Sequence, residues 1–475
     1  MLFPTLEFAL FFVVVFVANW LLRPQHTLWR VTMLGASLFF YGYWDAYFVL
    51  LLGGSIVSNW FLGEQLRERQ EREDLDGAKW VVRGAVALNL GVLGVFKYYG
   101  FFTEQLRDAL GGVGEAIPLL EITLPVGISF FTFQAMSYVI DIHRGRITSM
   151  ELLDFAVYLS FFPQLVAGPI VRASEFGPQI VASPDPRRVP TAEAFRLIFS
   201  GLFKKVVIST YLATEIVDDV FTLPDDHSAL EVLVAIYAYA IQIYADFSGY
   251  TDIAIGVALL LGFRFPQNFD APYRALSIQD FWRRWHMTLS NWLRDYLYIP
   301  LGGNRKGTLF TYRNLFLTML LGGLWHGAAW NFVIWGAIHG GVLAAERYVT
   351  GRWAASGRPA MLPTEVSNVL RWLYTFHVVC LAWVFFRAET FTLATSMLGR
   401  LGAWGEPNEL VTPVIVLVIG LMLLSQFVPI SRVRELQFEY GRLPWAVQGA
   451  LFGVGLVLVD VLGPEGVAPF IYFQF

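Results

Sequence analysis

The sequence predicts an all-α, polytopic integral membrane protein, on the evidence of its composition and its apolar runs. Of its 475 residues, 56% are hydrophobic and 16% aromatic, and only 15% are charged, against about 25% in ordinary soluble domains. The mean hydropathy is +0.53. Apolar runs of about 17 to 25 residues recur along the chain, which is the length a helix needs to cross a bilayer. The alternating segments typical of a membrane β-barrel are absent from the sequence.

Charge and cysteine content exclude several classes of protein. The formal net charge of -4 disfavours nucleic acid as a partner. The single cysteine, Cys380, allows no intramolecular disulfide and no metal–thiolate cluster, and we expect no metal site. Glu7 stands where a signal peptide would carry basic residues, so no cleavable signal is expected. Arg23 and Arg30 follow the first apolar run and predict a cytoplasmic location for that end.

The first part of the chain predicts spans of alternating direction. Residues 8–22 form the first, and residues 32–63 are too long for one helix and should break at 41–45. The charged stretch 64–83 then lies in the cytoplasm. Further apolar segments lie near 84–98, 122–140, 152–170, 194–214, 228–262, 278–300, 308–345, 366–387, 410–428 and 445–462.

The run 315–345 predicts a broken helix. As one helix it would be about 46 Å long at about 1.5 Å per residue, whereas the hydrocarbon core is only about 30 Å thick. Gly322, Gly323 and Gly327 offer places for a break. We expect about 10 to 12 spanning helices and one or two re-entrant segments, because broken backbone is tolerated at membrane depth where protein or water covers it.

His326 lies in the middle of this uncharged run and is the first candidate catalytic residue. From Leu315 to Ala345 the chain carries no Asp, Glu, Lys or Arg. Ionisable side chains at membrane depth usually face a polar cavity or a reaction centre, and a neutral imidazole can accept and return a proton near pH 7. We therefore predict His326, beside Trp325, to be a general base. The alternative is a hydrogen-bonded core histidine.

His339 cannot be paired with His326 by spacing alone. On one straight helix the two residues would differ in direction by about 220°. A structural role for His339 is therefore the favoured interpretation.

The densest polar stretch, 280–295, predicts a helix with two open interpretations. Ser277 and Asp280 resemble a capping box that starts the helix. Trp282 and His286 would then be i,i+4 neighbours, as would Ser290 and Arg294. The helix is either an interfacial amphipathic helix with a basic face or a wall of an active-site funnel. In the second case, His286 is a second catalytic or orienting residue.

The loop 299–307 could hold phosphates. Its glycines allow close backbone approach, and Arg305 and Lys306 supply positive charge. The same features also fit an ordinary cytoplasmic turn, which is the favoured interpretation from residue types alone.

Asp246, Tyr250 and Asp252 form a second polar motif beside an expected break at Ser248–Gly249. A buried carboxylate there could orient a histidine or pair with an arginine, and we favour a structural ion pair. The chain shows no Ser-His-Asp order, HExxH, Walker loop or GxSxG motif. A self-contained hydrolase or ATPase is therefore disfavoured.

The stretches 281–307 (FWRRWHMTLSNWLRDYLYIPLGGNRKG) and 321–327 (LGGLWHG) resemble the membrane-bound O-acyltransferase (MBOAT) family. Within it they are most similar to the branch that holds the membrane subunit of bacterial alginate O-acetyltransferase. Three further stretches carry the resemblance in the same order: 124–130, 167–172 and 246–256.

The resemblance implies that His326 is the essential histidine and that His286 lies near it. It implies a single integral-membrane domain over 1–475, with broken helices around a central tunnel. The core would occupy about 120–390, between N-terminal helices at 1–120 and C-terminal helices at 391–475. The donor would be cytoplasmic acetyl-CoA, with no bound cofactor. The candidate residues for contact with it are Arg283, Arg284, Arg294, Asn304, Arg305, Lys306 and Trp325.

The resemblance also implies a location in the bacterial inner membrane and a periplasmic SGNH-type partner that O-acetylates an exopolysaccharide such as alginate. Three alternatives remain open. The same fold could act on another polymer, by D-alanylation of teichoic acid or by acetylation of peptidoglycan or cellulose. The protein could instead be a transporter of a small anion or lipid, or a non-catalytic scaffold for polymer export.

Overall fold

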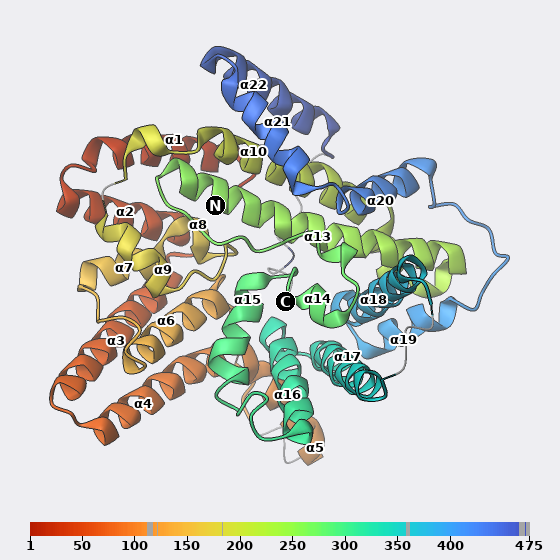
Figure 1. Cartoon of the computed structure of the whole chain (residues 1–475), viewed down its shortest axis with the longest axis horizontal. Coiled ribbons are helices and arrows are strands. Elements are labelled where there is room, and N and C mark those ends of the chain that lie inside the picture. The colour runs from red at the N-terminus through yellow and green to blue at the C-terminus, as the bar shows by residue number, and fades with distance from the viewer. Residues whose placement is uncertain (112–116, 121, 183, 358–361, 465–470, 472–475) are drawn as a thin grey trace. The chain divides into compact units, whose positions relative to one another are not determined.

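The computed structural model describes residues 1–111, 117–120, 122–182, 184–357, 362–464 and residue 471. Throughout this described part every regular element is a helix and none is a strand, which confirms the all-α prediction (Figure 1). The chain forms two compact units. The N-terminal unit comprises Met1–Ile198 and Thr251–Pro266, and the C-terminal unit comprises Phe199–Tyr250 and Gln267–Phe475. The single domain implied by the resemblance stays a prediction.

The N-terminal unit begins with helices that separate where the sequence predicts a break. α2 (His26–Gly42) ends just before α3 (Ala46–Glu71), and the Asp45 carboxylate accepts a 2.8 Å hydrogen bond from the Tyr47 amide. This N-cap satisfies an amide that the first helical turn would leave without a partner. The break predicted at 41–45 is confirmed. The other helices here are α1 (Leu6–Leu22), α4 (Leu75–Leu93), η1 (Gly94–Tyr98), α5 (Tyr99–Leu110), α6 (Ile128–His143), α7 (Leu152–Ser160), α8 (Phe162–Leu165), α9 (Ala173–Val181), η3 (Pro186–Arg188) and most of α10 (Thr191–Leu202).

The C-terminal unit contains the long helix α13 (Ala229–Leu260), whose last residues belong to the N-terminal unit. In its apolar window 72% of the residues are buried. The remaining helices of the C-terminal unit are η4 (Phe203–Ser209), α11 (Thr210–Leu212), η5 (Ala213–Val217), α12 (Asp218–Thr222), η6 (Pro224–Asp226), η7 (Pro272–Arg274), α14 (Ile278–Trp282), α15 (Met287–Leu293), η8 (Arg294–Tyr298), α16 (Thr308–His326), α17 (Trp330–Ala355), α18 (Thr364–Arg387), α19 (Phe391–Arg400), α20 (Pro413–Ser425), α21 (Ile430–Arg442) and α22 (Trp445–Leu462). Within this unit α17 packs against α14, α16 and α18 (Figure 1).

Several helices are long and apolar enough to cross a membrane, which supports a multi-pass membrane protein. In the described part of the chain these spans number six, or seven if α20 and α21, bent by 93°, form one broken span. The expected number of about 10 to 12 would require shorter or more polar helices such as α1 and α17 to cross as well, and it stays a prediction. The six spans are Ala46–Glu71, Leu75–Leu110, Thr191–Thr222, Ala229–Leu260, Thr364–Arg387 and Trp445–Leu462.

The run 315–345 breaks as predicted, but at only one of the expected glycine positions. α16 ends at His326 and α17 begins at Trp330, so the break follows Gly327. The prediction of a break at Gly322–Gly323 is wrong, because both residues lie inside α16. A Cβ atom on Gly323 would lie 2.2 Å from the backbone oxygen of Phe332. This glycine therefore allows two helix backbones to approach closely rather than interrupting one of them.

The break expected at Ser248–Gly249 is also wrong, since α13 is continuous there. A Cβ atom on Gly249 would lie 2.8 Å from the backbone oxygen of Gly201 and 3.1 Å from the amide nitrogen of Lys205. The glycine again marks close packing between helices.

Candidate active site

His326 is the last residue of α16, and its ring lies in an aromatic environment. The residue is 3% exposed. Its ring centroid lies 4.9 Å from that of Trp325, 5.0 Å from that of Trp335 and 5.3 Å from that of Phe386. The following residue, Gly327, has extended backbone. The candidate base is therefore positioned at a helix end inside the C-terminal unit.

His286 lies between two short helices, and this corrects the predicted continuous helix. α14 ends at Trp282, and His286 is the N-cap of α15 with a left-handed backbone, φ 41° and ψ 55°. Such a conformation costs a non-glycine residue about 1 to 3 kcal/mol. The Asn268 backbone oxygen accepts a 2.9 Å hydrogen bond from the Met287 amide, and the Asn268 side-chain oxygen accepts one of 3.1 Å from the Thr288 amide. Asn268 thus replaces the intrahelical bonds that a continuous helix would have made.

Three histidines alternate with tryptophans in the C-terminal unit. The ring centroids of successive members lie 6.1, 4.9, 5.0, 4.9 and 5.2 Å apart. We call this the histidine–tryptophan cluster, and its members in order are His286, Trp325, His326, Trp335, His339 and Trp282.

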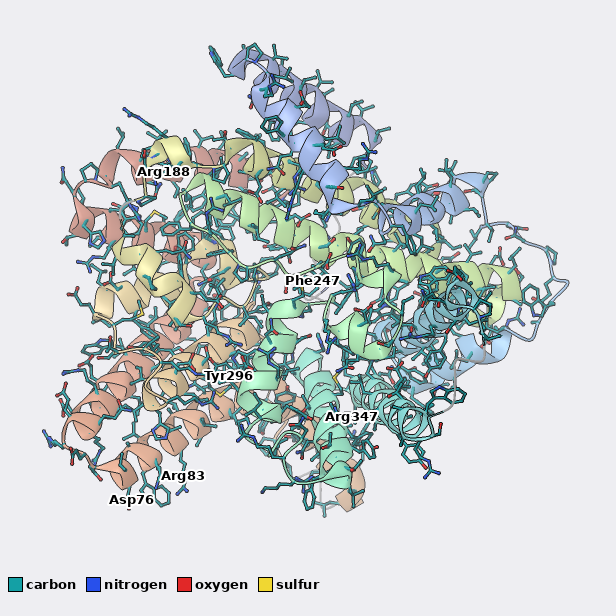
Figure 2. All side chains as sticks on the ribbon, viewed as in Figure 1. Asp76, Arg83, Arg188, Phe247, Tyr296 and Arg347 are labelled. Carbon is teal, nitrogen blue, oxygen red and sulfur yellow. The ribbon has the colours of Figure 1, made fainter. Side chains whose placement is uncertain are left out.

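The cluster joins histidines that the sequence could not pair. Trp335 contacts both His326 and His339, because the break after α16 lets α17 pack back against α16. His286 also contacts Phe247 of α13, with ring centroids 4.6 Å apart, and Figure 2 labels Phe247. The structure therefore brings His286, as well as His339, into one buried cluster with the candidate base.

A cavity of about 710 Å³ adjoins the cluster at Trp282. We call it the arginine pocket, because four arginines line it. Its lining residues are Arg283, Arg294, Arg347, Arg371, Glu346, Ser277, Gln279, Ser290, Asn291, Asn304, Thr318, Thr350, Tyr298, Trp282, Met287, Leu293, Ile299, Leu315, Met319 and Leu343. Neither His326 nor His286 is among them. The tunnel that would reach His326 stays a prediction.

The candidate donor-binding residues divide into those in this pocket and those outside it. Arg283, Arg294 and Asn304 line it, whereas Arg305 and Lys306 lie on an exposed turn. Trp325 belongs to the cluster, not to the pocket lining.

Arg284 has a different environment from its neighbour Arg283. Its guanidinium pairs with Asp270 at 3.0 Å and with Asp280 at 2.9 Å. Two carboxylates therefore balance its charge, and these contacts indicate a structural role.

Sequence reasoning missed Arg347, Arg371 and Glu346. They come from α17 and α18, far along the chain from the 280–307 stretch (Figure 2, Arg347). One signal could have found two of them, since Glu346 and Arg347 are the first charges after the uncharged run that ends at Ala345.

Asp246 forms a buried ion pair, but with a lysine rather than an arginine. Its carboxylate pairs with Lys205, and both side chains are at most 4% exposed. The same carboxylate accepts a 3.2 Å hydrogen bond from the Ser209 hydroxyl and one of 2.9 Å from the Ile471 amide. Tyr250, one turn further along α13, is 1% exposed. The orienting role stays a prediction.

Asp252 lies beyond this group in the chain. It is half-buried and belongs to the part of α13 that lies in the N-terminal unit. The sequence motif therefore extends over both units.

Comparison with known proteins identifies the class. A profile described as MBOAT, membrane-bound O-acyltransferase family, matches residues 110–386. The probable alginate O-acetylase AlgI of Pseudomonas putida is 40% identical over 414 residues, covering 86% of this chain and 81% of that protein. The corresponding protein of Pseudomonas aeruginosa is 41% identical, covering 85% and 75%. The peptidoglycan O-acetyltransferase of Helicobacter pylori is 41% identical, covering 80% and 74%.

The helices and the matched region together define a multi-pass membrane acyltransferase. The chain belongs to the membrane-bound O-acyltransferase family, and it is an O-acyltransferase. This confirms the resemblance found in the sequence and replaces the transporter and scaffold alternatives. The match at 110–386 contains the whole cluster and every lining residue of the arginine pocket.

Proposed function

We propose that the protein takes an acetyl group from cytoplasmic acetyl-CoA and passes it across the bacterial inner membrane. The recipient is a periplasmic SGNH-type partner, which O-acetylates an alginate-like exopolysaccharide. The names of the Pseudomonas relatives support the reaction class and the polymer. The arginine pocket is the observation that carries the donor assignment.

The chemistry of the arginine pocket fits a coenzyme A ester. Arginine guanidinium groups recognise phosphate oxygens with paired hydrogen bonds, and Arg283, Arg347 and Arg371 lie in one cavity of about 710 Å³. That volume falls in the range of small-molecule sites, about 300 to 1,000 Å³. Arg305 and Lys306 precede α16, and Arg347 and Arg352 lie near the end of α17, so the positive-inside rule supports a cytoplasmic location for these helix ends. A cytoplasmic donor would enter from this side.

The proposed chemistry is acyl transfer with His326 as general base. His326 removes a proton from the hydroxyl or thiol of the acceptor, which then attacks the thioester carbonyl carbon of acetyl-CoA. The carbon–sulfur bond breaks, the acetyl group stays on the acceptor, and the coenzyme A sulfur leaves and takes up a proton. His286 would orient the reacting groups. Trp282 is the member of the histidine–tryptophan cluster that lines the pocket, so we expect the thioester to approach His326 from the Trp282 side.

An assay with purified protein and acetyl-CoA carrying a labelled acetyl group tests this proposal. We expect release of free coenzyme A, accelerated by an acceptor, and labelled product on the acceptor. Loss of both in His326→Ala, with transfer retained in His377→Ala, would support the base assignment. Full transfer by His326→Ala would refute it.

A second acceptor, peptidoglycan, is favoured by one observation. The Helicobacter pylori peptidoglycan O-acetyltransferase is as similar in identity as the alginate relatives, at 41%. Parallel assays with alginate oligosaccharides and with muropeptides, each with its own periplasmic partner, separate the two acceptors. Labelling of muropeptides alone would overturn the alginate assignment and leave the donor assignment intact.

A further inference from the structure

His339 links the arginine pocket to the candidate base. Its ring is fully buried on α17. The Trp282 indole donates a hydrogen bond of 3.3 Å from Nε1 to Nδ1 of His339. The His339 ring also contacts Trp335, with ring centroids 4.9 Å apart, and Trp335 in turn contacts Trp282 at 5.6 Å and His326 at 5.0 Å. One histidine therefore touches both the pocket wall and the residue packed on His326.

The hydrogen bond fixes the state of the His339 ring. An indole N–H can only donate, so Nδ1 must be the unprotonated nitrogen, and Nε2 carries the proton of the neutral ring. In the described part of the chain this bond is the ring's only hydrogen bond, since Nε2 has no partner there. A protonated ring would carry N–H groups on both nitrogens and could not accept it. The contact therefore requires a neutral acceptor at the Nδ1 position.

α17 holds both ends of the short helix α14. Glu346, two helical turns after His339, accepts hydrogen bonds of 3.0 and 3.1 Å from the Ile278 amide at the start of α14. His339 accepts the bond from Trp282 at its end. Residues seven apart lie on the same face of a helix, so one face of α17 sets where α14 lies. A helix of five residues cannot hold its own geometry without such contacts.

We propose that His339 is a positioning residue that holds Trp282 in the wall of the arginine pocket, where the pocket adjoins the histidine–tryptophan cluster. By its contact with Trp335, His339 also holds the Trp335 ring in position against His326. It acts through these two tryptophans and touches no reacting atom. The inference rests on the proposed function in one respect, namely that the pocket takes acetyl-CoA.

Three substitutions separate positioning from packing. His339→Phe keeps an aromatic ring but removes the acceptor, and Trp282→Phe keeps a ring but removes the donor. His339→Asn places an oxygen near the Nδ1 position and restores the acceptor. We expect about a tenfold fall in kcat for each Phe variant, because misplacement by about 1 Å near a reaction centre has large effects on rate. His339→Asn should stay within about threefold of the wild type.

The double variant shows whether the two residues act through one bond. Groups that share a single interaction have non-additive effects. Trp282→Phe with His339→Phe should therefore be no slower than either single variant. A kcat loss in the double variant equal to the product of the two single losses would overturn the proposal. So would wild-type kcat and KM in folded His339→Phe, since a residue used only for packing changes the yield of folded protein but not the kinetics of the folded molecules.

A spectroscopic measurement tests the contact without any activity. The Trp282 indole ¹⁵N–H resonance in detergent-solubilised protein should move to lower proton frequency in His339→Phe and return in His339→Asn. The resonance should not move in His377→Phe. This variant removes a histidine on α18 whose Nε2 lies 2.9 Å from the Tyr237 hydroxyl. If the resonance moves as expected but the wild type transfers no acetyl group, the proposed function fails and the contact stands. An unmoved resonance in His339→Phe would overturn the inference itself.

Discussion

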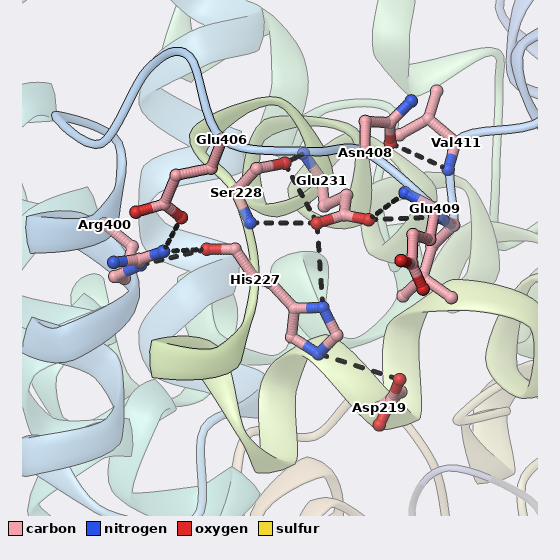
Figure 3. Close-up of polar contacts among 10 residues, drawn as sticks. Asp219, His227, Ser228, Glu231, Arg400, Glu406, Asn408, Glu409 and Val411 are labelled. Atoms are coloured by element: carbon pink, nitrogen blue, oxygen red, sulfur yellow. Dashed lines mark hydrogen bonds and ion pairs between the residues drawn. The ribbon is translucent and has the colours of Figure 1, made fainter.

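The histidine–tryptophan cluster and the polar network around Glu231 hold buried titratable side chains in opposite ways. In the network, Glu231 Oε2 accepts hydrogen bonds of 2.9 Å from both the amide and the hydroxyl of Ser228 (Figure 3). Its Oε1 accepts bonds of 2.8 and 3.0 Å from the amides of Glu409 and Leu410. The two bonds from Glu409 and Leu410 tie the loop before α20 to the start of α13, and the two from Ser228 lie within that start.

The same network surrounds a histidine with carboxylates rather than rings. His227 has Asp219 3.6 Å from Nε2 and Glu231 3.8 Å from Nδ1, and its backbone oxygen accepts a 2.9 Å bond from Arg400 (Figure 3). His326, by contrast, has Trp335 and other rings around it. Four donors favour the ionised form of this carboxylate, because protonation would turn one of its acceptor oxygens into a donor, and this suits an anchor. The ring contacts of His326 do not depend on which ring nitrogen carries a proton, which suits a base that takes up and returns one.

Removal of the His326 imidazole is the largest test of this comparison. We expect His326→Ala to lower acetyl transfer by about a thousandfold, within the range of about 10² to 10⁴ that a general base contributes. The thermal unfolding midpoint of His326→Ala should stay close to that of the wild type, which shows that the loss of rate does not come from unfolding. The matched control is His377→Ala, an exposed histidine on α18, which should retain transfer within about twofold. Equal losses in both variants would contradict a special role for the cluster.

The cluster depends on close backbone packing, so a single methyl group should disturb it. Gly323→Ala would place a Cβ atom 2.2 Å from the Phe332 backbone oxygen and push α16 away from α17. We expect destabilisation of about 3 kcal/mol, the upper part of the range for overpacking, measured by thermal melting in detergent.

The control for this variant lies on the adjacent helix. Among the described residues, no heavy atom outside the local backbone of α17 lies within 4 Å of a Cβ added at Gly341. Gly341→Ala should therefore be neutral or stabilising by up to about 1 kcal/mol, because alanine is the better helix former. A Gly323→Ala protein as stable as Gly341→Ala would show that the packing of α16 on α17 is not what supports His326.

The polar network around Glu231 should lose stability when its hydrogen bonds are removed, rather than when its packing is disturbed. Glu231→Ala leaves the Ser228, Glu409 and Leu410 amides without their acceptor, and we expect a loss of about 2 kcal/mol. Glu231→Gln keeps one carbonyl oxygen and should lose about half as much. Thermal melts measure both, and transfer per folded molecule should stay at the wild-type level. A loss of rate without a loss of stability would place Glu231 in the reaction instead.

The two regions also differ in what their sequence reveals. Length and hydropathy predicted the break in 315–345, because bilayer thickness limits every span. Local sequence did not say which glycine marks the break. Gly323 and Gly327 look alike in the sequence, and only the position of α17 shows that Gly323 serves close packing.

Tertiary contacts hide the rest of the site from the sequence. The left-handed backbone at His286 depends on Asn268, which lies in the preceding loop. The arginine pocket is completed by Arg347 and Arg371 from helices that no motif connects to 280–307. The family motifs predicted which segments matter, and the packing of α17 determines how they meet.

The smallest expected effect distinguishes the arginine pocket from the exposed turn that the sequence offered for phosphate binding. Arg347→Ala should raise the KM for acetyl-CoA about tenfold with little change in kcat, since it removes one charge-assisted contact to a phosphate. Lys306→Ala, on the exposed turn, should change KM by less than about twofold. Increasing salt should reduce the difference in KM between Arg347→Ala and the wild type, because screening weakens the arginine–phosphate contact that the wild type keeps. The reverse ranking would assign the donor's phosphates to the turn at 299–307, and the pocket would then need another anionic occupant.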